Sequence, residues 1–562
     1  MNRRFFLALL LTAVVVMLTP VLFPGRPRAP VSQSADPAPG AARPAAPTRP
    51  PGAAALPVAD TARTIGDSLA VPAVRAETVA VATPNARLRL SSLGGALIGA
   101  EFANYHSLGG DSSRVELARA HEPLLQFQIV VGGDTIPLDR MPLSVTADSA
   151  RGTVEFGGAA RGVPVSVRWS FAPDTYHVRI NRQDEPVGYV HRLTVEASGV
   201  GVGAYLLVDL PRGFRSSEAD SATDYQHLAY AYKPVNGGAD LIRFGKLDPG
   251  ERRLRPGPHQ WAVAKSKYFL VGILARTESE AFAELQVTGT PRTWRMHTSG
   301  HATVVVPMQS GRADLEVYAG PQEWRRLLAM GRAFESANPY GGFMQGMIQP
   351  FATIVMRVLL WMKDVLQLNY GWTLIIFGIL VRVVLWPLNQ TAMRASLRMQ
   401  RIQPELSAAQ KKYASNPQKQ REEIMRIYRE HGMSPFSALS GCLPMLIPMP
   451  VLFALFFVFQ NTIEFRGVSF WWMVDISQKD PFYILPVVMA ASMFVLSWIG
   501  MRNAPPNPQA KLMLYFLPGM MLVILFNFAA GLNLYYAAQN LAALPQQWLI
   551  ANERAKLAKP SG

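Results

Sequence analysis

Hydrophobic and polar residues alternate over much of the first part of the chain, from about residue 79 to residue 318. The clearest run is VSVRWSF at residues 165–171, in which Val165, Val167 and Trp169 alternate with polar residues. A strand with one buried face requires this period of two, because successive side chains point to opposite faces of a sheet. The pattern therefore predicts β-strands that each bury one side.

Further strand-like runs lie at residues 175–180, 191–197, 204–210, 267–274 and 313–319. Gly, Pro and Asp separate them, which predicts an antiparallel β-sandwich over residues 79–320. Such a domain is an enzyme, a binding module, or a structural and docking element. His297 and His301 are not a helical metal pair, because Gly300 lies between them and no acidic partner completes a zinc motif. We expect a structural or docking role.

The pattern becomes helical after about residue 335. Residues 321–368 predict connecting helices, of which the segment from Phe343 to Leu368 has one apolar face. Arg357 and Asp364 make a membrane span costly there, so a helix lying flat on the membrane surface is favoured. Five apolar segments of spanning length follow, at residues 370–388, 436–460, 482–500, 512–528 and 531–550.

The N-terminus has two arginines ahead of an apolar run that ends at Phe23. It is either a cleaved signal peptide or a retained anchor. The run is long and no small-residue cleavage site follows it directly, which favours a transmembrane signal anchor at residues 1–23. Residues 24–78 are rich in Pro and Ala and predict a disordered linker. The fold class expected is an α-helical polytopic membrane protein with six transmembrane helices and an added all-β sandwich.

Charge sets the expected orientation of these helices. The 562 residues include 55 Lys and Arg against 39 Asp and Glu, a net charge of +16. In a membrane protein such an excess indicates orientation and contact with anionic lipids before it indicates nucleic acid. The connection at residues 389–434 is the most basic loop, so it is expected in the cytoplasm together with both termini, and the sandwich on the opposite side. The basic residues of the connection 389–434 are Arg394, Arg398, Arg401, Lys411, Lys412, Lys419, Arg421, Arg426 and Arg429.

Two helical patterns within this connection, broken near Asn416 and Pro417, predict an antiparallel helical hairpin. A solvated charged hairpin is one interpretation, and contact with lipid head groups or ribosomal RNA is another. No base-stacking aromatic residues are interleaved with the charges, so no sequence-specific nucleic-acid reader is expected. The short basic tail at residues 551–562 has too few cations for more than weak ribosome binding.

Arg382 is the only charged residue in the segment 370–388. An arginine near the centre of a span costs about 2.5–3.5 kcal/mol on insertion scales, and such residues usually face a wet or protein-lined space. Arg382 is also close enough to the nearer end for its side chain to reach the membrane surface by snorkelling. Both interpretations remain open at this point.

Polar residues also line the last predicted span. Tyr536 and Asn540 lie near one helical stripe with Asn533 and Gln547; Gln539 lies beside it, and Asn527 is on the preceding span. Hydrogen bonding between helices is the usual explanation of such residues. A stripe this broad, in the same bundle as Arg382, also fits a hydrated groove.

The chain resembles the YidC family of bacterial membrane protein insertases. The resemblance rests on Arg382, the basic hairpin, and the motifs GCLPMLIPMPVLFALFF (441–457), DPFYILPVVM (480–489) and GLNLYY (531–536), and AGPQEW (319–324) extends it towards the β domain. It implies a core of five transmembrane helices at residues 369–550, around a groove in the bacterial inner membrane, and a periplasmic β domain. Arg382 is then the charge of that groove, and Tyr536 one of its lining residues.

The function implied is insertion of nascent membrane proteins, alone or with the Sec translocon, without covalent chemistry. No phosphate-binding loop, nucleophile triad or metal cluster is present in the sequence, so we expect neither an enzyme nor a cofactor. A transporter is an alternative function, although no internal repeat is present in the sequence. A membrane-anchored glycan-binding protein is a further alternative, which five additional spans disfavour.

Overall fold

The computed structural model describes residues 76–111, 113–172, 176–201, 203–291, 298–340, 345–387, 390, 402, 404–431, 449–502 and 508–558. The predicted anchor at residues 1–23 lies outside the described residues, as do nearly all of the predicted linker and the first part of the predicted span 436–460. Arg394, Arg398 and Arg401 of the predicted hairpin also lie outside them.

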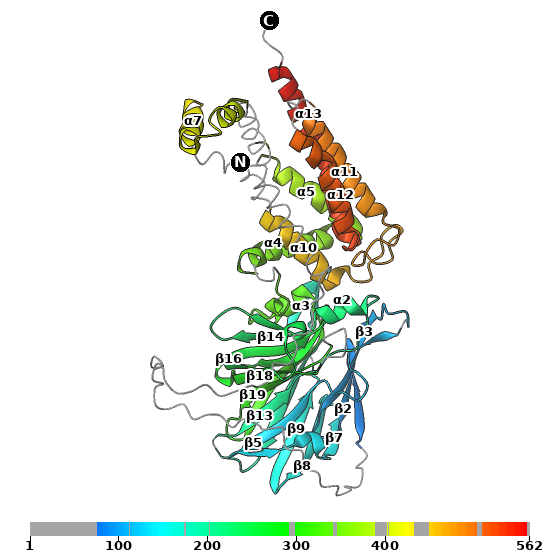
Figure 1. Ribbon diagram of the computed structural model, residues 1–562. Coiled ribbons are helices and arrows are strands. Elements are labelled where there is room, and N and C mark those ends of the chain that lie inside the picture. Colours follow the sequence, from blue (N-terminus) through cyan, green and yellow to red (C-terminus); the bar gives the residue numbers. More distant parts are fainter. Residues whose placement is uncertain are drawn as a thin grey trace, which may run out of the picture. The chain divides into compact units, whose positions relative to one another are not determined.

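The first part of the described chain is a β domain (Figure 1). Its strands are β1 (Thr78–Ala82), β2 (Ala86–Ser91), β3 (Leu97–His106), β4 (Arg114–Glu116), β5 (Gln126–Val131), β6 (Asp134–Ile136), β7 (Ser144–Asp148), β8 (Thr153–Ala160), β9 (Val163–Ser170), β10 (His177–Ile180), β11 (Gln183–Pro186), β12 (Val190–Ala197), β13 (Tyr205–Asp209), β14 (Ala229–Pro234), β15 (Asp240–Arg243), β16 (Arg252–Lys265), β17 (Phe269–Ala275), β18 (Phe282–Gly289), β19 (Gly300–Pro307) and β20 (Arg312–Pro321).

The strands pair antiparallel and form the expected β-sandwich. The larger sheet has 14 strands, with the order β6-β5-β13-β19-β18-β16-β17-β20-β12-β9-β8-β7 and β14 and β15 off this path. A second sheet contains β1 to β4, and β10 pairs with β11. The 14-residue strand β16 pairs with β18 through its first half and with β17 through its second half. The register shifts between Pro256 and His259, where β16 passes from one set of neighbours to the other.

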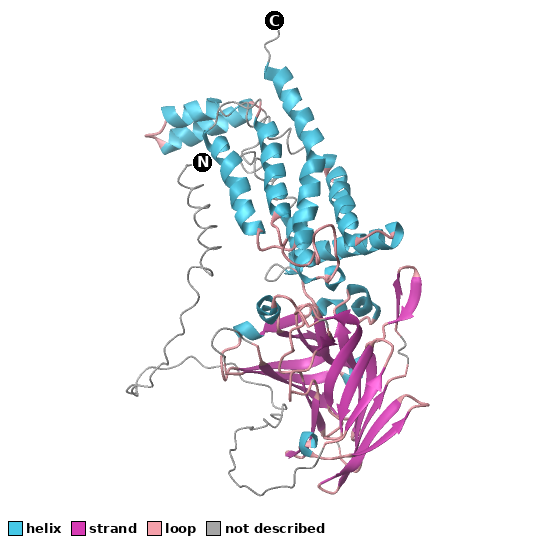
Figure 2. Ribbon diagram, turned by 90° about the vertical axis from the view of Figure 1, so that its right-hand side faces the viewer, coloured by secondary structure: helices cyan, strands magenta, loops and turns pink. Residues whose placement is uncertain are grey.

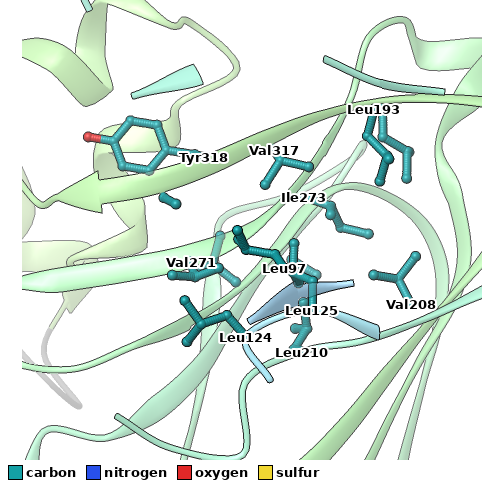
Figure 3. Close-up of a cluster of buried hydrophobic side chains, with 14 of the residues drawn as sticks. Leu97, Leu124, Leu125, Leu193, Val208, Leu210, Val271, Ile273, Val317 and Tyr318 are labelled. Atoms are coloured by element: carbon teal, nitrogen blue, oxygen red, sulfur yellow. The ribbon is translucent and has the colours of Figure 1, made fainter. Parts of the chain in front are cut away.

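The run at residues 165–171 correctly predicted β9, and the other runs named from the sequence also coincide with strands, although β17 is buried throughout and does not alternate. In β9, Val165, Val167 and Trp169 are buried, whereas Arg168 is exposed. The buried faces meet in one large apolar core; Figure 3 shows part of it, where Leu97, Leu125 and other labelled side chains from several strands come together. The sandwich is therefore held by its own core.

The second part of the described chain is helical. Short α3 (Trp324–Ala329) precedes α4 (Gln345–Leu366), α5 (Tyr370–Val384), α7 (Pro417–Glu430), α10 (Met449–Asn461), α11 (Ile484–Met501), α12 (Pro508–Leu525) and α13 (Ala530–Ala558), and α2 (Ser221–Gln226) belongs to the β domain. Helix α4 has exposed apolar residues two turns apart, Met347, Ile354 and Trp361, and its position on a membrane surface stays a prediction.

Helix α13 is central to the helical part. It packs against both α5 and α11, and α11 also packs against α12. In Figure 2 the helices are drawn in cyan and the strands of the β domain in magenta. Helix α13 continues to Ala558, so residues 551–558 extend the last helix rather than form the separate tail that we expected. Among the described residues, only α11 has the length and composition of a membrane span, while α5 and residues 514–525 of α12 are apolar but shorter.

The loop after α10 contains a buried carboxyl group, Glu464. Its Oε1 accepts a hydrogen bond from the backbone N–H of Trp324, 3.1 Å away. It lines a cavity of about 280 Å³ together with charged residues of α4 and of the segment around α3, including Glu323. Burial, and then the nearby charge of Glu323, raises the pKa of Glu464 to about 7.

Replacing Trp169 by alanine should destabilise the β domain by about 3–5 kcal/mol, because the side chain is fully buried and leaves a large cavity. Its Nε1 also donates to the carbonyl oxygen of Gly95 at 2.9 Å, and that acceptor loses its partner. The loss of the β-sheet circular dichroism signal on heating would measure the effect. The control is Arg168→Ala on the exposed face of the same strand, and equal losses for the two variants would contradict this account of the core.

Glu464→Gln should remove one source of pH dependence in the stability of the chain. The raised pKa means that the folded protein binds a proton more tightly than the unfolded chain does, so this contribution to stability is complete below about pH 4.5 and is lost as the pH rises through about 7. The variant should therefore be more stable than the wild type at pH 8, by about 1–3 kcal/mol, and should lose that advantage near pH 4.5. Thermal unfolding at both pH values measures the difference. Glu278→Gln on an exposed turn is the control, and an equal effect there would contradict the prediction.

Candidate functional site

Arg382 lies in the last turn of α5, twelve residues after its first residue, Tyr370. At 1.5 Å per residue, Arg382 lies about 18 Å along the helix axis from Tyr370. The residue is half-buried, and its Nε is buried without a hydrogen-bond partner among the described residues. No carboxylate of the described residues forms an ion pair with it. A charge in this position has lost part of its hydration without gaining a counter-ion from the described chain.

Helices α5 and α13 run in the same direction, which defines the depth of Arg382. Gly378 of α5 lies against Tyr535 of α13, so closely that a Cβ atom on Gly378 would be 3.0 Å from the Tyr535 carbonyl oxygen. Further along, Gln546 Nε2 donates to the carbonyl oxygen of Trp386 at 3.3 Å. Arg382 therefore lies at the level of α13 residues between Tyr535 and Gln546.

The polar residues of α13 divide according to their neighbours. Asn540 Nδ2 donates to Ser492 Oγ of α11 at 3.2 Å, and Ser492 Oγ donates to the Met489 carbonyl oxygen at 2.7 Å. Tyr536 packs with Met489 and with residues of α12. Both Tyr536 and Asn540 thus lie on the face of α13 that meets α11, whereas α5 packs on the face that carries Tyr535.

The structure separates the predicted groove residues into three places. Arg382 of α5 and Asn540 of α13 lie at similar depth, but Asn540 is on the face of α13 that meets α11, whereas α5 packs on the face that carries Tyr535. Gln539 is half-buried on α13 beside Asn540. Asn527 is exposed in the turn between α12 and α13, because α12 ends at Leu525. It therefore lies outside both helices, three residues before α13 begins, although we had expected it within the segment 512–528.

Two polar residues have bonding roles that the stripe analysis did not identify. Asn533 is fully buried, and its Nδ2 donates to the Leu525 carbonyl oxygen at 3.2 Å, which stabilises the turn between α12 and α13. Gln546 is also buried, and its bond to Trp386 joins α13 to the end of α5. Gln546 is adjacent in sequence to Gln547, the residue that we had placed on the polar stripe. The sequence alone could not show that Gln546 is the one that bonds to Trp386.

Asp480 explains why the DPFYILP motif begins with an acidic residue. Its side chain is fully buried and accepts three hydrogen bonds, from Trp472 Nε1 at 3.0 Å and from the backbone N–H groups of Phe482 and Leu485 at 3.0 and 2.7 Å. The carboxylate thereby satisfies donors at the start of α11. This part of the motif is structural and positions α11.

The described part of the connection 389–434 is a helical hairpin. Residues 404–412 and α7 are helical, and Ile402, Leu406 and Ala409 pack against Ile427 and Tyr428. The side chains of Lys411 and Lys412 are exposed near the tip, before the turn at Asn416. The described hairpin therefore combines a small apolar interface with a basic surface.

Comparisons with known proteins cover both parts of the chain. The family model "60Kd inner membrane protein" matches residues 361–557, and the model "YidC periplasmic domain" matches residues 78–354. The curated "Membrane protein insertase YidC" of Anaeromyxobacter dehalogenans (strain 2CP-1) is 33% identical over 377 residues, 66% of this chain and 66% of the relative. That of Pelodictyon phaeoclathratiforme is 32% identical over 355 residues, 60% of this chain and 58% of the relative. The matches thus span less than two thirds of the length of these relatives.

Among solved structures, "Active YidC insertase crystal structure with the first transmembrane domain resolved" is 18% identical, with a TM-score of 0.33. The match covers 84% of this chain and 93% of that chain.

Proposed function

The chain belongs to the YidC family of inner-membrane proteins with a periplasmic domain, and we propose that it inserts nascent membrane proteins, its clients, into the bacterial inner membrane. The names of its relatives, all called membrane protein insertase, support this function. The observation that carries the proposal in this chain is Arg382, a charge in an apolar helix without a counter-ion among the described residues.

Arg382 would act on the part of a client that must cross the membrane. An acidic or polar segment pays a large desolvation cost on entering the bilayer, and a hydrated groove with a positive charge lowers that cost. The adjoining apolar helix of the client gains free energy by moving into lipid. Burial of that helix drives insertion, so the protein needs neither an energy-carrying nucleotide nor a covalent step.

We assign the groove charge to Arg382 and its further polar lining to Tyr536, Gln539 and Asn540. Depth supports this assignment for Asn540, which lies at a similar level to Arg382, although on the face of α13 that meets α11. Asn540 also bonds to Ser492 of α11, so it has a second role in fixing the position of α13. Asn527 is left out of the proposed lining because it lies in an exposed turn.

The proposed topology has six transmembrane helices, with both termini and the hairpin in the cytoplasm. The excess of basic residues in the connection 389–434 supports this orientation. The exposed Lys411 and Lys412 make the hairpin a proposed contact for ribosomes, anionic lipids or arriving clients. The Sec translocon is a further proposed partner.

Arg382→Ala should lower the insertion of clients with acidic translocated segments by about tenfold or more, because it removes a Coulombic attraction in a medium of low dielectric constant. Arg382→Lys should keep much of the activity. Insertion into proteoliposomes would be measured for matched clients that differ only in their Asp and Glu content. Val384→Ala is the control, because Val384 is exposed on the same helix.

Equal effects of Arg382→Ala on acidic and neutral clients would contradict the charge mechanism. A snorkelling arginine predicts a different result, in which apolar replacements are tolerated without dependence on the client.

Replacing residues 404–430 by a short Gly/Ser linker should abolish client insertion and leave the β domain and long helices folded. The reason is that the hairpin packs on itself through Ile402, Leu406 and Tyr428 and presents its basic surface before a client reaches the helices. Client insertion and ribosome co-sedimentation measure the effect. Removing residues 553–562 is the comparison, and should change ribosome co-sedimentation only slightly. Normal insertion without the hairpin would show that it is only a solvated loop.

A further inference from the structure

The segment at residues 461–466, directly after α10, is attached to the β domain by several side chains. We infer that the β domain holds the end of α10 in position through this segment. The ion pair between Glu218 and Arg466 is the main interaction that attaches the segment to the β domain. The part of this inference that concerns client insertion rests on the proposed function. It contrasts with the sequence, which places the β domain after a long Pro- and Ala-rich linker and gives no sign of a fixed joint.

The ion pair joins residues 248 positions apart. Arg466 Nε donates to Glu218 Oε1 at 2.8 Å, and both side chains are only 4% exposed. A second donor of the same guanidinium, Nη2, reaches the Ser217 carbonyl oxygen at 3.3 Å. The guanidinium also lies 5.6 Å from the ring centroid of Phe269, at the start of β17. Removing either partner of such a pair leaves a buried charge without compensation, which is strongly destabilising.

Two further contacts hold the same segment. Ile463 is 3% exposed and belongs to the apolar core of the β domain rather than to the core of the helices. Asn338 Nδ2 donates to the Asn461 carbonyl oxygen at 3.1 Å, and Lys265 Nζ of β16 donates to Asn338 Oδ1 at 2.7 Å. The last residue of α10 is therefore connected to the long strand β16 through buried polar groups.

The neighbours of α10 explain why this attachment matters. Helix α10 packs chiefly against α4, and it also contacts the central helix α13, where the rings of Phe459 and Tyr535 lie 5.7 Å apart. Thr462, which follows α10, is buried and donates to the Met356 sulfur of α4 at 3.5 Å. Ala454, Leu455 and Val458 of α10 are buried in the core of the helical part, so packing fixes the body of the helix. The β domain adds a second constraint at its end, through the segment 461–466.

The test combines a distance measurement with an activity measurement on the full chain in lipid nanodiscs and proteoliposomes. Spin labels are placed at two exposed positions, Glu278 in the β domain and Val474 in the loop after α10, with Cys442 replaced by serine. The variants are Glu218→Ala, Arg466→Ala, the double alanine variant, and the exchanged pair Glu218→Arg with Arg466→Glu. Arg215→Ala is the matched control. Arg215 lies in the same loop as Glu218, but it forms an exposed ion pair with Asp111.

We expect each single variant to broaden the distance distribution and to lower client insertion per folded molecule. If the two side chains acted independently, the effects of the two single variants on client insertion would multiply. The double variant should instead retain about three times more insertion than that product, or more. The exchanged pair should recover a narrower distribution, and Arg215→Ala should change neither quantity.

Single losses that multiply without interaction, or a distance distribution that no variant changes, would overturn the inference. A change of distance with unchanged insertion would overturn the positioning role for activity. If the wild-type chain inserts no client, the proposed function fails, and the distance measurements still decide whether the ion pair holds the segment.

Discussion

The helical part contains a charge, that of Arg382, for which the described residues provide no counter-ion. Burying an ion without a partner costs a large desolvation free energy. The Nε of Arg382 is buried without a hydrogen-bond partner among the described residues. The cost falls if water or a passing anionic segment can reach the guanidinium. A site of this kind is only useful if its surroundings are rigid, since a loose bundle would let the side chain turn towards the membrane surface.

Polar groups at several levels of the helical part hold its helices together. Asn540 bonds to Ser492, Gln546 bonds to the end of α5, and Asp480 satisfies the donors at the start of α11. Each of these groups makes at least one hydrogen bond within the described chain, whereas the Nε of Arg382 has no partner among the described residues. Bonding between helices thus accounts for Gln546 and Asp480, and Asn540 combines such a bond with its proposed place in the groove lining.

Sequence patterns predicted local structure well and spatial neighbours poorly. Alternation correctly predicted β9, and the apolar face correctly predicted α4, because both depend on residues close in sequence. The angular position of Asn540 on a helix did not reveal that it meets α11 rather than α5. The contact between Glu218 and Arg466 was also out of reach, because it joins two loops 248 residues apart that carry no local signal. The helix end at Leu525 removed Asn527 from its predicted span, and boundaries of this kind depend on turn contacts such as that of Asn533.

The most direct test of the central claim is photocrosslinking from α5 to a client held on a stalled ribosome. A crosslinking amino acid at Ile379, which is 44% exposed and one turn before Arg382, would report on segments close to the guanidinium. The same substitution at Tyr515 of α12, 67% exposed, is the reference position. The account predicts a strong adduct at residue 379 with a client whose translocated segment is acidic, a weaker one with a neutral segment, and loss of the difference in Arg382→Ala. Equal adducts for both clients, unaffected by Arg382→Ala, would contradict it.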